Sequence, residues 1–168
     1  MKRTLVAGAV GVGALLVSGL GPAPAAHAEE RVCRGTIGQT TVDNVRVPAG
    51  AFCALNGTRV RGTVKVERGG RLSAYRAGIV GNVQAEGHSN VSVGWTVVGG
   101  SIQLKQGGGA LLRYNAVKAD IQLFTNRGSE GVYYNRVNGN LQCKSNIPAP
   151  HGRGNVVGGN KEDQCRRL

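Results

Sequence analysis

Two carboxylates and one imidazole are spaced in a way that could support cleavage of a glycosidic bond. Glu67 and Glu86 lie 19 residues apart, and His88 follows two residues later. Retaining glycosidases hold two carboxyl groups about 5 Å apart, one as nucleophile and one as acid. Glu67 and Glu86 would approach that separation if 19 residues were one period of the fold. Lys105, one period further on, would neutralise the column, so a solvated ionic ladder is the favoured interpretation.

A second group of residues could bind sugars. Its members each precede by three residues the start of a repeated heptad; they are Arg76, Trp95, Tyr114 and Tyr134. If successive coils of a solenoid place them in one column, the three aromatic side chains could form a platform for sugar rings. Arg113 and Arg136 would lie nearby and attract acidic groups. The aromatic side chains could instead cover a corner of the hydrophobic core.

Other residue types that support catalysis are sparse. The histidines beyond the N-terminal segment, His88 and His151, are far apart in the repeat, which argues against a metal site. The chain has no G-x-S-x-G, H-E-x-x-H or phosphate-binding loop motif. We therefore expect neither a metal nor a cofactor.

A heptad repeat determines how all these side chains would be placed. It reads VRGTVKV, IVGNVQA, VGGSIQL, VKADIQL and VNGNLQC in successive copies. Its first residues recur at intervals of 19 or 20, at Thr41, Val60, Ile79, Val98, Val117, Val137 and Val157. A fixed period near 20 residues indicates a solenoid whose coils are each too small to bury their own apolar face.

The pattern within each period predicts β-strands. Apolar residues alternate in the heptad, as at Val98, Ile102 and Leu104, and a second alternating segment follows about eight residues later, ending with GVY from Gly131. The 28 glycines leave no long run of good helix formers. The predicted fold is all-β, a single-domain parallel β-helix over residues 29–168 with at least two strands per coil. Its interior should contain the column Val64, Val83, Ile102, Ile121 and Leu141.

Two polar columns also follow from the period. One column consists of Gln84, Gln103, Gln122 and Gln142, and the other of Thr58, Ala77, Thr96, Asn115, Asn135 and Asn155. Amides in register can hydrogen-bond along the stack, and Asn tolerates the backbone angles of corners. We interpret both columns as architectural.

The four cysteines allow three pairings on paper, and the period selects one of them. Cys33 and Cys53 are about one coil apart, as are Cys143 and Cys165, which suits the Cα separation of roughly 4.4 to 6.8 Å in disulfides. Each bridge would hold a terminal coil against its neighbour.

Residues 1–28 have the features of a secretory signal peptide. MKR is followed by an apolar run to Leu20 and by the small residues APAAHA, so the mature chain would begin at Glu29. After cleavage we expect no membrane span. Loss of Lys2 and Arg3 lowers the formal charge from +12 to +10. The expected partners are anionic, such as acidic glycans or cell-wall polymers, whereas nucleic acid is not expected for an exported chain.

The C-terminal stretch VNGNLQCKSNIPAPHGRGNVVGGNKEDQC, with the V-x-G-N-V repeats, resembles a group of small secreted actinobacterial Gly-rich repeat proteins of unknown function. The resemblance implies a right-handed parallel β-helix and export from a Gram-positive bacterium, and it implies no activity or site residues. More distantly, the short coils are similar to those of bactofilin-like and pectin-degrading β-helix proteins.

Together these observations predict a secreted, non-catalytic binding or structural protein, extracellular or associated with the cell wall. The alternative is a carbohydrate-active enzyme of the polysaccharide lyase or glycosidase kind. The sequence predicts no oligomeric state.

Overall fold

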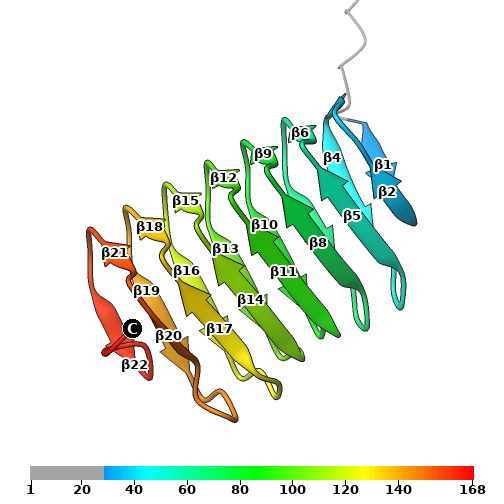
Figure 1. Cartoon of the computed structure of the whole chain (residues 1–168). Helices are drawn as coiled ribbons and strands as arrows, with labels where there is room; N and C mark the ends of the chain where they lie inside the picture. Colours follow the sequence, from blue (N-terminus) through cyan, green and yellow to red (C-terminus); the bar gives the residue numbers. More distant parts are fainter. Residues whose placement is uncertain (1–28) are drawn as a thin grey trace, which may run out of the picture.

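The computed structural model describes residues 29–168, in which all regular secondary structure is β. The chain winds through about seven coils of a parallel β-solenoid, as the all-β prediction required. Figure 1 shows the coils one behind another, from the blue N-terminal end to the red C-terminal end. The predicted signal peptide, residues 1–28, lies outside the described residues.

Each coil contributes one strand to each of three parallel sheets, which we call A, B and C. Sheet A contains β1 (Glu30–Val32), β4 (Asn44–Val47), β7 (Val64–Val66), β10 (Val83–Glu86), β13 (Ile102–Lys105), β16 (Ile121–Phe124), β19 (Leu141–Lys144) and β22 (Lys161–Asp163). Sheet B contains β2 (Gly35–Ile37), β5 (Phe52–Asn56), β8 (Arg71–Tyr75), β11 (Asn90–Gly94), β14 (Gly109–Arg113), β17 (Glu130–Tyr133) and β20 (His151–Arg153). Sheet C contains β3 (Thr41–Val42), β6 (Arg59–Val60), β9 (Gly78–Ile79), β12 (Val97–Val98), β15 (Ala116–Val117), β18 (Arg136–Val137) and β21 (Val156–Val157).

The heptad crosses a corner of the solenoid. Its first residue belongs to a two-residue strand of sheet C, and its fifth and seventh belong to sheet A, as Val60 and Val64 illustrate. The sequence predicted at least two strands per coil, and the third strand, of sheet C, has only two residues, which is too short to show alternation. The first coil also differs by one residue, because Val42, and not Thr41, pairs with Val60. Val42 carries the apolar side chain that this column requires.

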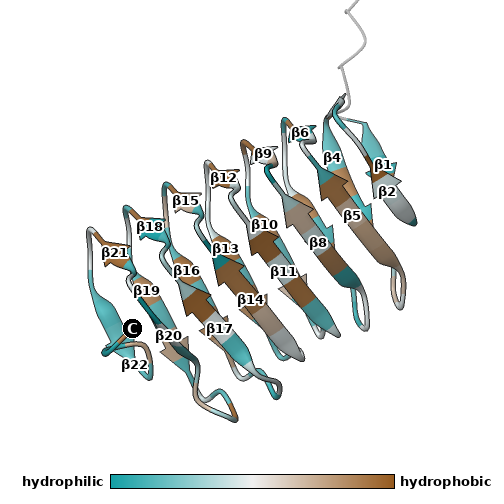
Figure 2. Cartoon of the chain, in the orientation of Figure 1, coloured by the Kyte–Doolittle hydropathy of each residue, from teal (hydrophilic) through white to brown (hydrophobic). Residues whose placement is uncertain are grey.

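The predicted interior column is confirmed. Parallel pairing places Val64, Val83, Ile102, Ile121 and Leu141 in register, and none of them is exposed to solvent. Figure 2 shows apolar residues recurring at matching places in successive strands. Each coil therefore gains its core from the coils on either side.

Both predicted disulfides are present. The Cα atoms of Cys33 and Cys53 are 5.5 Å apart, and those of Cys143 and Cys165 are 5.2 Å apart. Each bridge links neighbouring coils at one end of the solenoid, where coils have a partner on one side only.

Buried amide side chains hold the corner between sheets B and C. Asn135 Oδ1 accepts a hydrogen bond from Asn115 N at 3.1 Å, and Asn135 Nδ2 donates to the Leu112 carbonyl at 2.9 Å. The Thr and Asn column is thus architectural, as expected. The other two corners have ladders of their own that the sequence analysis missed; they include Asn126 and Asn146 in one, and Asn44, Thr63, Asn82, Ser101, Asp120 and Asn140 in the other.

The predicted glutamine column forms a directional ladder on sheet A. Each Nε2 donates to the Oε1 of the next coil, at 3.1 Å from Gln84 to Gln103 and 2.9 Å from Gln103 to Gln122. Gln142 ends the series by donating to a carboxylate oxygen of Glu162 at 2.8 Å. A negative acceptor therefore terminates the donor end of the ladder.

Replacing Asn135 by Ala should lower the free energy of unfolding by about 2 to 4 kcal/mol, because the buried Asn115 N–H loses its acceptor and the Leu112 carbonyl loses a donor. Urea denaturation of the disulfide-bonded protein would measure the change. Asn138→Ala is the matched control, since Asn138 is exposed and close by. Equal losses in the two variants would contradict the role given to the corner amides.

Candidate functional site

The structure places Arg76, Trp95, Tyr114 and Tyr134 at one equivalent position of successive coils, at the corner between sheets B and C. The backbone hydrogen bonds show this register, because Trp95 N donates to the Arg113 carbonyl at 3.1 Å and Tyr114 N donates to the Tyr133 carbonyl at 3.0 Å. These residues therefore share one column along the solenoid axis.

The backbone at this position is unusual for large side chains. The φ angles are 50° at Arg76, 49° at Trp95, 56° at Tyr114 and 53° at Tyr134. Left-handed backbone of this kind costs a non-glycine residue on the order of 1 kcal/mol and is rare for bulky residues. Glycine occupies the equivalent places at either end, with φ of 67° at Gly57 and 71° at Gly154. The corner geometry therefore favours glycine and does not explain the aromatic side chains.

The aromatic rings stack on one another along the axis. The centroids of Trp95 and Tyr114 are 4.7 Å apart at an interplanar angle of 25°, and those of Tyr114 and Tyr134 are 5.2 Å apart at 7°. Tyr75 adds a fourth ring, edge-on to Trp95 at 5.4 Å. The sequence analysis missed Tyr75, which belongs to the neighbouring column of β8. We call Tyr75, Trp95, Tyr114 and Tyr134 the aromatic ridge.

Both ends of the stack are covered. At one end the Tyr134 ring occupies the space that a side chain at Gly154 would need, and Arg153 Nε donates to the Tyr134 hydroxyl at 3.0 Å. At the other end the Tyr75 ring packs edge-on against Trp95, and the Arg113 guanidinium lies 4.9 Å from the centroid of the Trp95 ring. The ring faces are thus occupied by neighbouring groups, unlike those of an open platform.

The ridge still presents a large surface to solvent. Tyr75, Trp95, Tyr114 and Tyr134 are between 39% and 46% exposed. Tyrosine hydroxyl groups and the indole N–H can donate hydrogen bonds, and the rings can make apolar contacts. The arrangement can therefore bind a ligand that lies along the edges of the stack.

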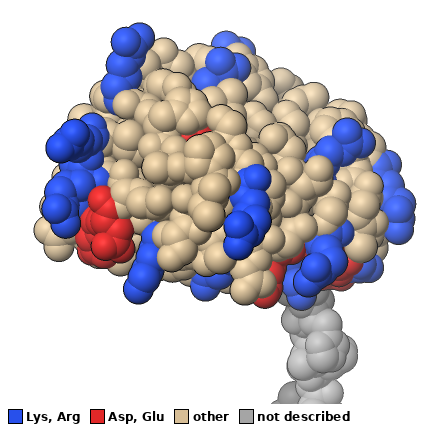
Figure 3. Space-filling view, turned by 90° about the horizontal axis from the view of Figure 1, so that it is seen from below, with Lys and Arg blue, Asp and Glu red and all other residues tan. Residues whose placement is uncertain are grey.

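Arginines surround the ridge. Arg76 lies over the Tyr75 ring at 5.2 Å, and exposed Arg136 begins β18 two residues after Tyr134. Within residues 29–168 the only cations in ion pairs are Arg46 and Arg61. No arginine at the ridge is therefore paired with a carboxylate of that range. Basic side chains are not confined to the ridge. Figure 3 shows Lys and Arg spread over the face in view, without one cluster.

The structure does not assemble Glu67, Glu86 and His88 into one site. Glu67 lies 3.4 Å from Arg46 Nη1 and accepts a hydrogen bond from Ala49 N at 3.1 Å. Glu86 is exposed and pairs in register with Lys105. His88 is inside the solenoid, with 2% of its surface exposed. Within residues 29–168 Glu67 is paired with Arg46 and Glu86 makes no ion pair, so no continuous ionic ladder runs through the two carboxylates.

A buried acid that the sequence analysis missed lies in the core. The repeated pattern aligned Gly131 with Ala110 of the preceding coil. In the structure Glu130 pairs with Ala110 instead, and Glu130 is fully buried. The sequence pattern did not indicate an acid at an interior position. Burial raises the pKa of Glu130 to about 7, partly opposed by a 2.8 Å hydrogen bond from Asn126 Nδ2.

Burial also lowers the pKa of His88. The His88 imidazole fills space above Gly107, where any side chain would collide with the ring. Perturbed pKa values often mark active sites. Here neither His88 nor Glu130 is accessible to a substrate, so we assign both groups to the core.

Comparison of the chain with family models, with curated proteins and with solved structures finds no match. Residues 29–168 contain no helix with the length and hydropathy of a membrane span. The same residues contain no group of three or more His, Cys, Asp and Glu side chains arranged to hold a metal ion.

Glu130→Gln should flatten the dependence of stability on pH. The folded state keeps Glu130 protonated up to about pH 7, whereas the unfolded chain ionises it near its ordinary pKa of 4.5, so native stability falls as pH rises between these values. We expect thermal unfolding to show that wild-type protein loses up to about 3 kcal/mol across this window and that the variant does not.

The control for this experiment is Glu86→Gln, which removes an exposed carboxylate and should retain the wild-type profile. His88 acts in the opposite direction, because the unfolded chain takes up its proton first on acidification, and this contribution remains in all three proteins. Identical profiles for wild type and Glu130→Gln would show that Glu130 is ionised in the fold.

Proposed function

We propose that this protein is a secreted, non-catalytic binding protein of the cell envelope or its surroundings, and that it holds an extended acidic polymer along the aromatic ridge. Acidic glycans and anionic cell-wall polymers are the ligand classes of this kind. The observation that carries the proposal is the stack of three exposed rings, Trp95, Tyr114 and Tyr134, with Tyr75 edge-on beside it, at corner positions whose backbone favours glycine. Strained positions occupied by costly residues are frequent at binding sites.

An extended polymer matches the repeat of the ridge. Successive coils are separated by about 4.8 Å, so a chain lying parallel to the axis meets one aromatic edge per coil. Hydroxyl groups of Tyr114 and Tyr134 can hydrogen-bond to the polymer, and the guanidinium groups of Arg76, Arg113 and Arg136 can pair with its acidic groups. The basic net charge of the whole chain would add a salt-dependent attraction.

Export is part of the proposal. Two disulfides in a chain of this size are typical of oxidising compartments outside the cytosol, and the N-terminal segment has the composition of a signal peptide. We also assign the chain to the small secreted actinobacterial Gly-rich repeat proteins that its sequence resembles. Nucleic acid is not proposed as a ligand, because an exported protein would rarely meet it.

A carbohydrate-active enzyme is less well supported. Glu67 is engaged by Arg46, Glu86 is aligned with Lys105, and Glu130 is sealed in the core. No two of these carboxyl groups resemble the pair of accessible carboxyl groups that glycosidases use.

Trp95→Ala and Tyr114→Ala should each weaken binding of an acidic glycan or wall polymer by roughly 5-fold to 100-fold, the range expected for removal of one aromatic contact. Calorimetric titration and co-sedimentation would measure the loss, and circular dichroism would confirm that each variant is folded. Phe52→Ala is the matched control, since Phe52 is 43% exposed and lies outside the ridge.

Product analysis of the same mixtures tests the enzyme alternative. Glu67→Gln and Glu86→Gln should leave polymer binding intact, and no shortened polymer should appear with any of the proteins. Cleavage that these two variants abolish would favour the enzyme. Polymer binding that survives loss of Trp95 and Tyr114 would place the ligand on another face.

A further inference from the structure

Sheet C has a groove of about 680 Å³ on its outer surface, beside the corner that carries the aromatic ridge. Gly78 and Gly99 form part of its floor, in neighbouring coils. Arg59 and Val80 lie on the side of the earlier coils, and Val97 and Lys118 on the side of the later coils. Each side therefore offers one valine and one cation.

Gly78 is present without a backbone reason. It lies inside β9, its φ is outside the left-handed region, and a side chain there would meet no atom within 4 Å. Glycine in a strand is less favourable than alanine, because it loses more backbone freedom on folding. Gly99 differs, because any side chain there would collide with the Val80 carbonyl. What the glycine at position 78 provides is open space.

The chemistry of the lining is aliphatic and cationic. Val80 is 58% exposed and Val97 is 51% exposed, which leaves apolar surface that a ligand could cover. The lining contains no aromatic ring and no carboxylate. Its one hydroxyl, on Thr58, is buried and already donates to the Ile37 carbonyl at 2.8 Å.

We propose that this groove binds a single alkyl chain with an anionic head group, as in a long-chain fatty acid. The chain lies over Gly78 between Val80 and Val97, and the head group pairs with Arg59 or Lys118, which have no ion-pair partner within residues 29–168. A sugar fits less well, because its hydroxyl groups would find few side-chain partners there. The site is separate from the ridge and does not depend on polymer binding.

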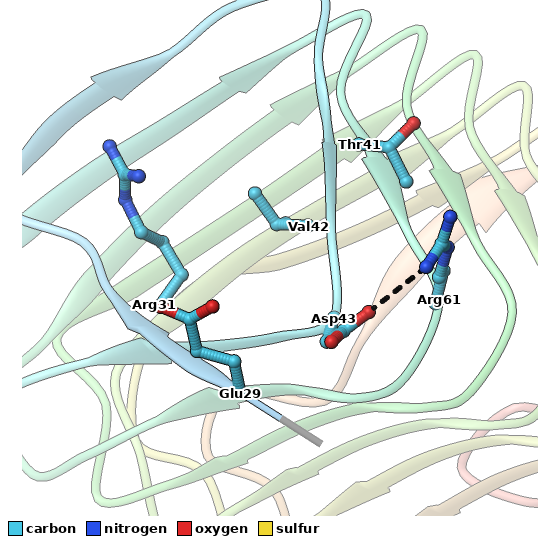
Figure 4. A pocket seen from close by; sticks show the side chains of 6 residues that line it. All are labelled: Glu29, Arg31, Thr41, Val42, Asp43 and Arg61. Atoms are coloured by element: carbon cyan, nitrogen blue, oxygen red, sulfur yellow. Dashed lines mark ion pairs between the residues drawn. The ribbon is translucent and has the colours of Figure 1, made fainter. Parts of the chain in front are cut away.

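We propose no ligand for a smaller cavity of about 290 Å³ at the N-terminal end. Figure 4 shows Asp43 and Arg61 facing each other there, and their side chains are 3.6 Å apart. Glu29, the first described residue, also lines it.

Titration of the purified protein with a fluorescent long-chain fatty acid tests the proposal. We expect saturable binding to wild type and at least about tenfold weaker binding to Gly78→Val, since the new side chain fills the groove at a position where an added Cβ meets no atom within 4 Å. Ala116→Val is the matched control, because it adds a similar side chain at the same position of β15, outside the lining. Equal affinities for Gly78→Val and wild type, or no saturable binding to wild type, would overturn the proposal.

The head group is tested with the Arg59→Gln and Lys118→Gln double variant. It should bind the fatty acid more weakly than wild type but bind the fatty alcohol of equal length with unchanged affinity. Equal loss for both ligands would refute the charge pairing. Trp95→Ala should retain wild-type binding of the fatty acid, and loss in that variant would place the fatty acid on the ridge.

Discussion

Parallel pairing of each coil with the next, in unbroken register, is the constraint on which the rest of the structure depends. It brings each side chain to within about 5 Å of the equivalent side chains in neighbouring coils. A column of similar residues is therefore stable only if such side chains make favourable contacts with one another. Valine and isoleucine pack on themselves, glutamine amides hydrogen-bond to the next amide, and aromatic rings stack. Carboxylates repel one another, and Lys105, which pairs in register with Glu86, places the opposite charge beside it.

Contacts between residues that lie one coil apart depend only on the repeat period, so the sequence was sufficient to predict them. The interior column through Ile102, the two disulfides and the hydrogen-bonded glutamines all follow from knowing which residues are one coil apart. Period does not determine side-chain torsions. It therefore could not reveal that Tyr75 joins the ridge from an adjacent column, or that the ring faces are occupied by neighbouring rings. Glu130 was missed because hydropathy patterns assign acids to the surface.

The polar groups of this molecule fall into two sets, one buried and one exposed. The buried polar groups, such as Asn135 and Glu130, serve the corners and the core. The two surfaces proposed to bind ligands lie outside, on two sides of one corner. The ridge offers hydrogen-bond donors and guanidinium groups, whereas the groove beside it offers aliphatic surface between cations. The two surfaces suit ligands of different polarity.

Both disulfides connect neighbouring coils at the ends, so the central coils are joined by the continuous backbone and by non-covalent contacts, without a disulfide between them. Whole coils can therefore be gained or lost by duplication or deletion of one repeat without breaking either bridge or shifting any column. The number of coils is then a modular quantity, and duplication of a coil that carries a ridge residue would lengthen the ridge. For a multivalent polymer, avidity would rise with each ring added, so lineages could tune ligand retention by chain length without altering a single contact.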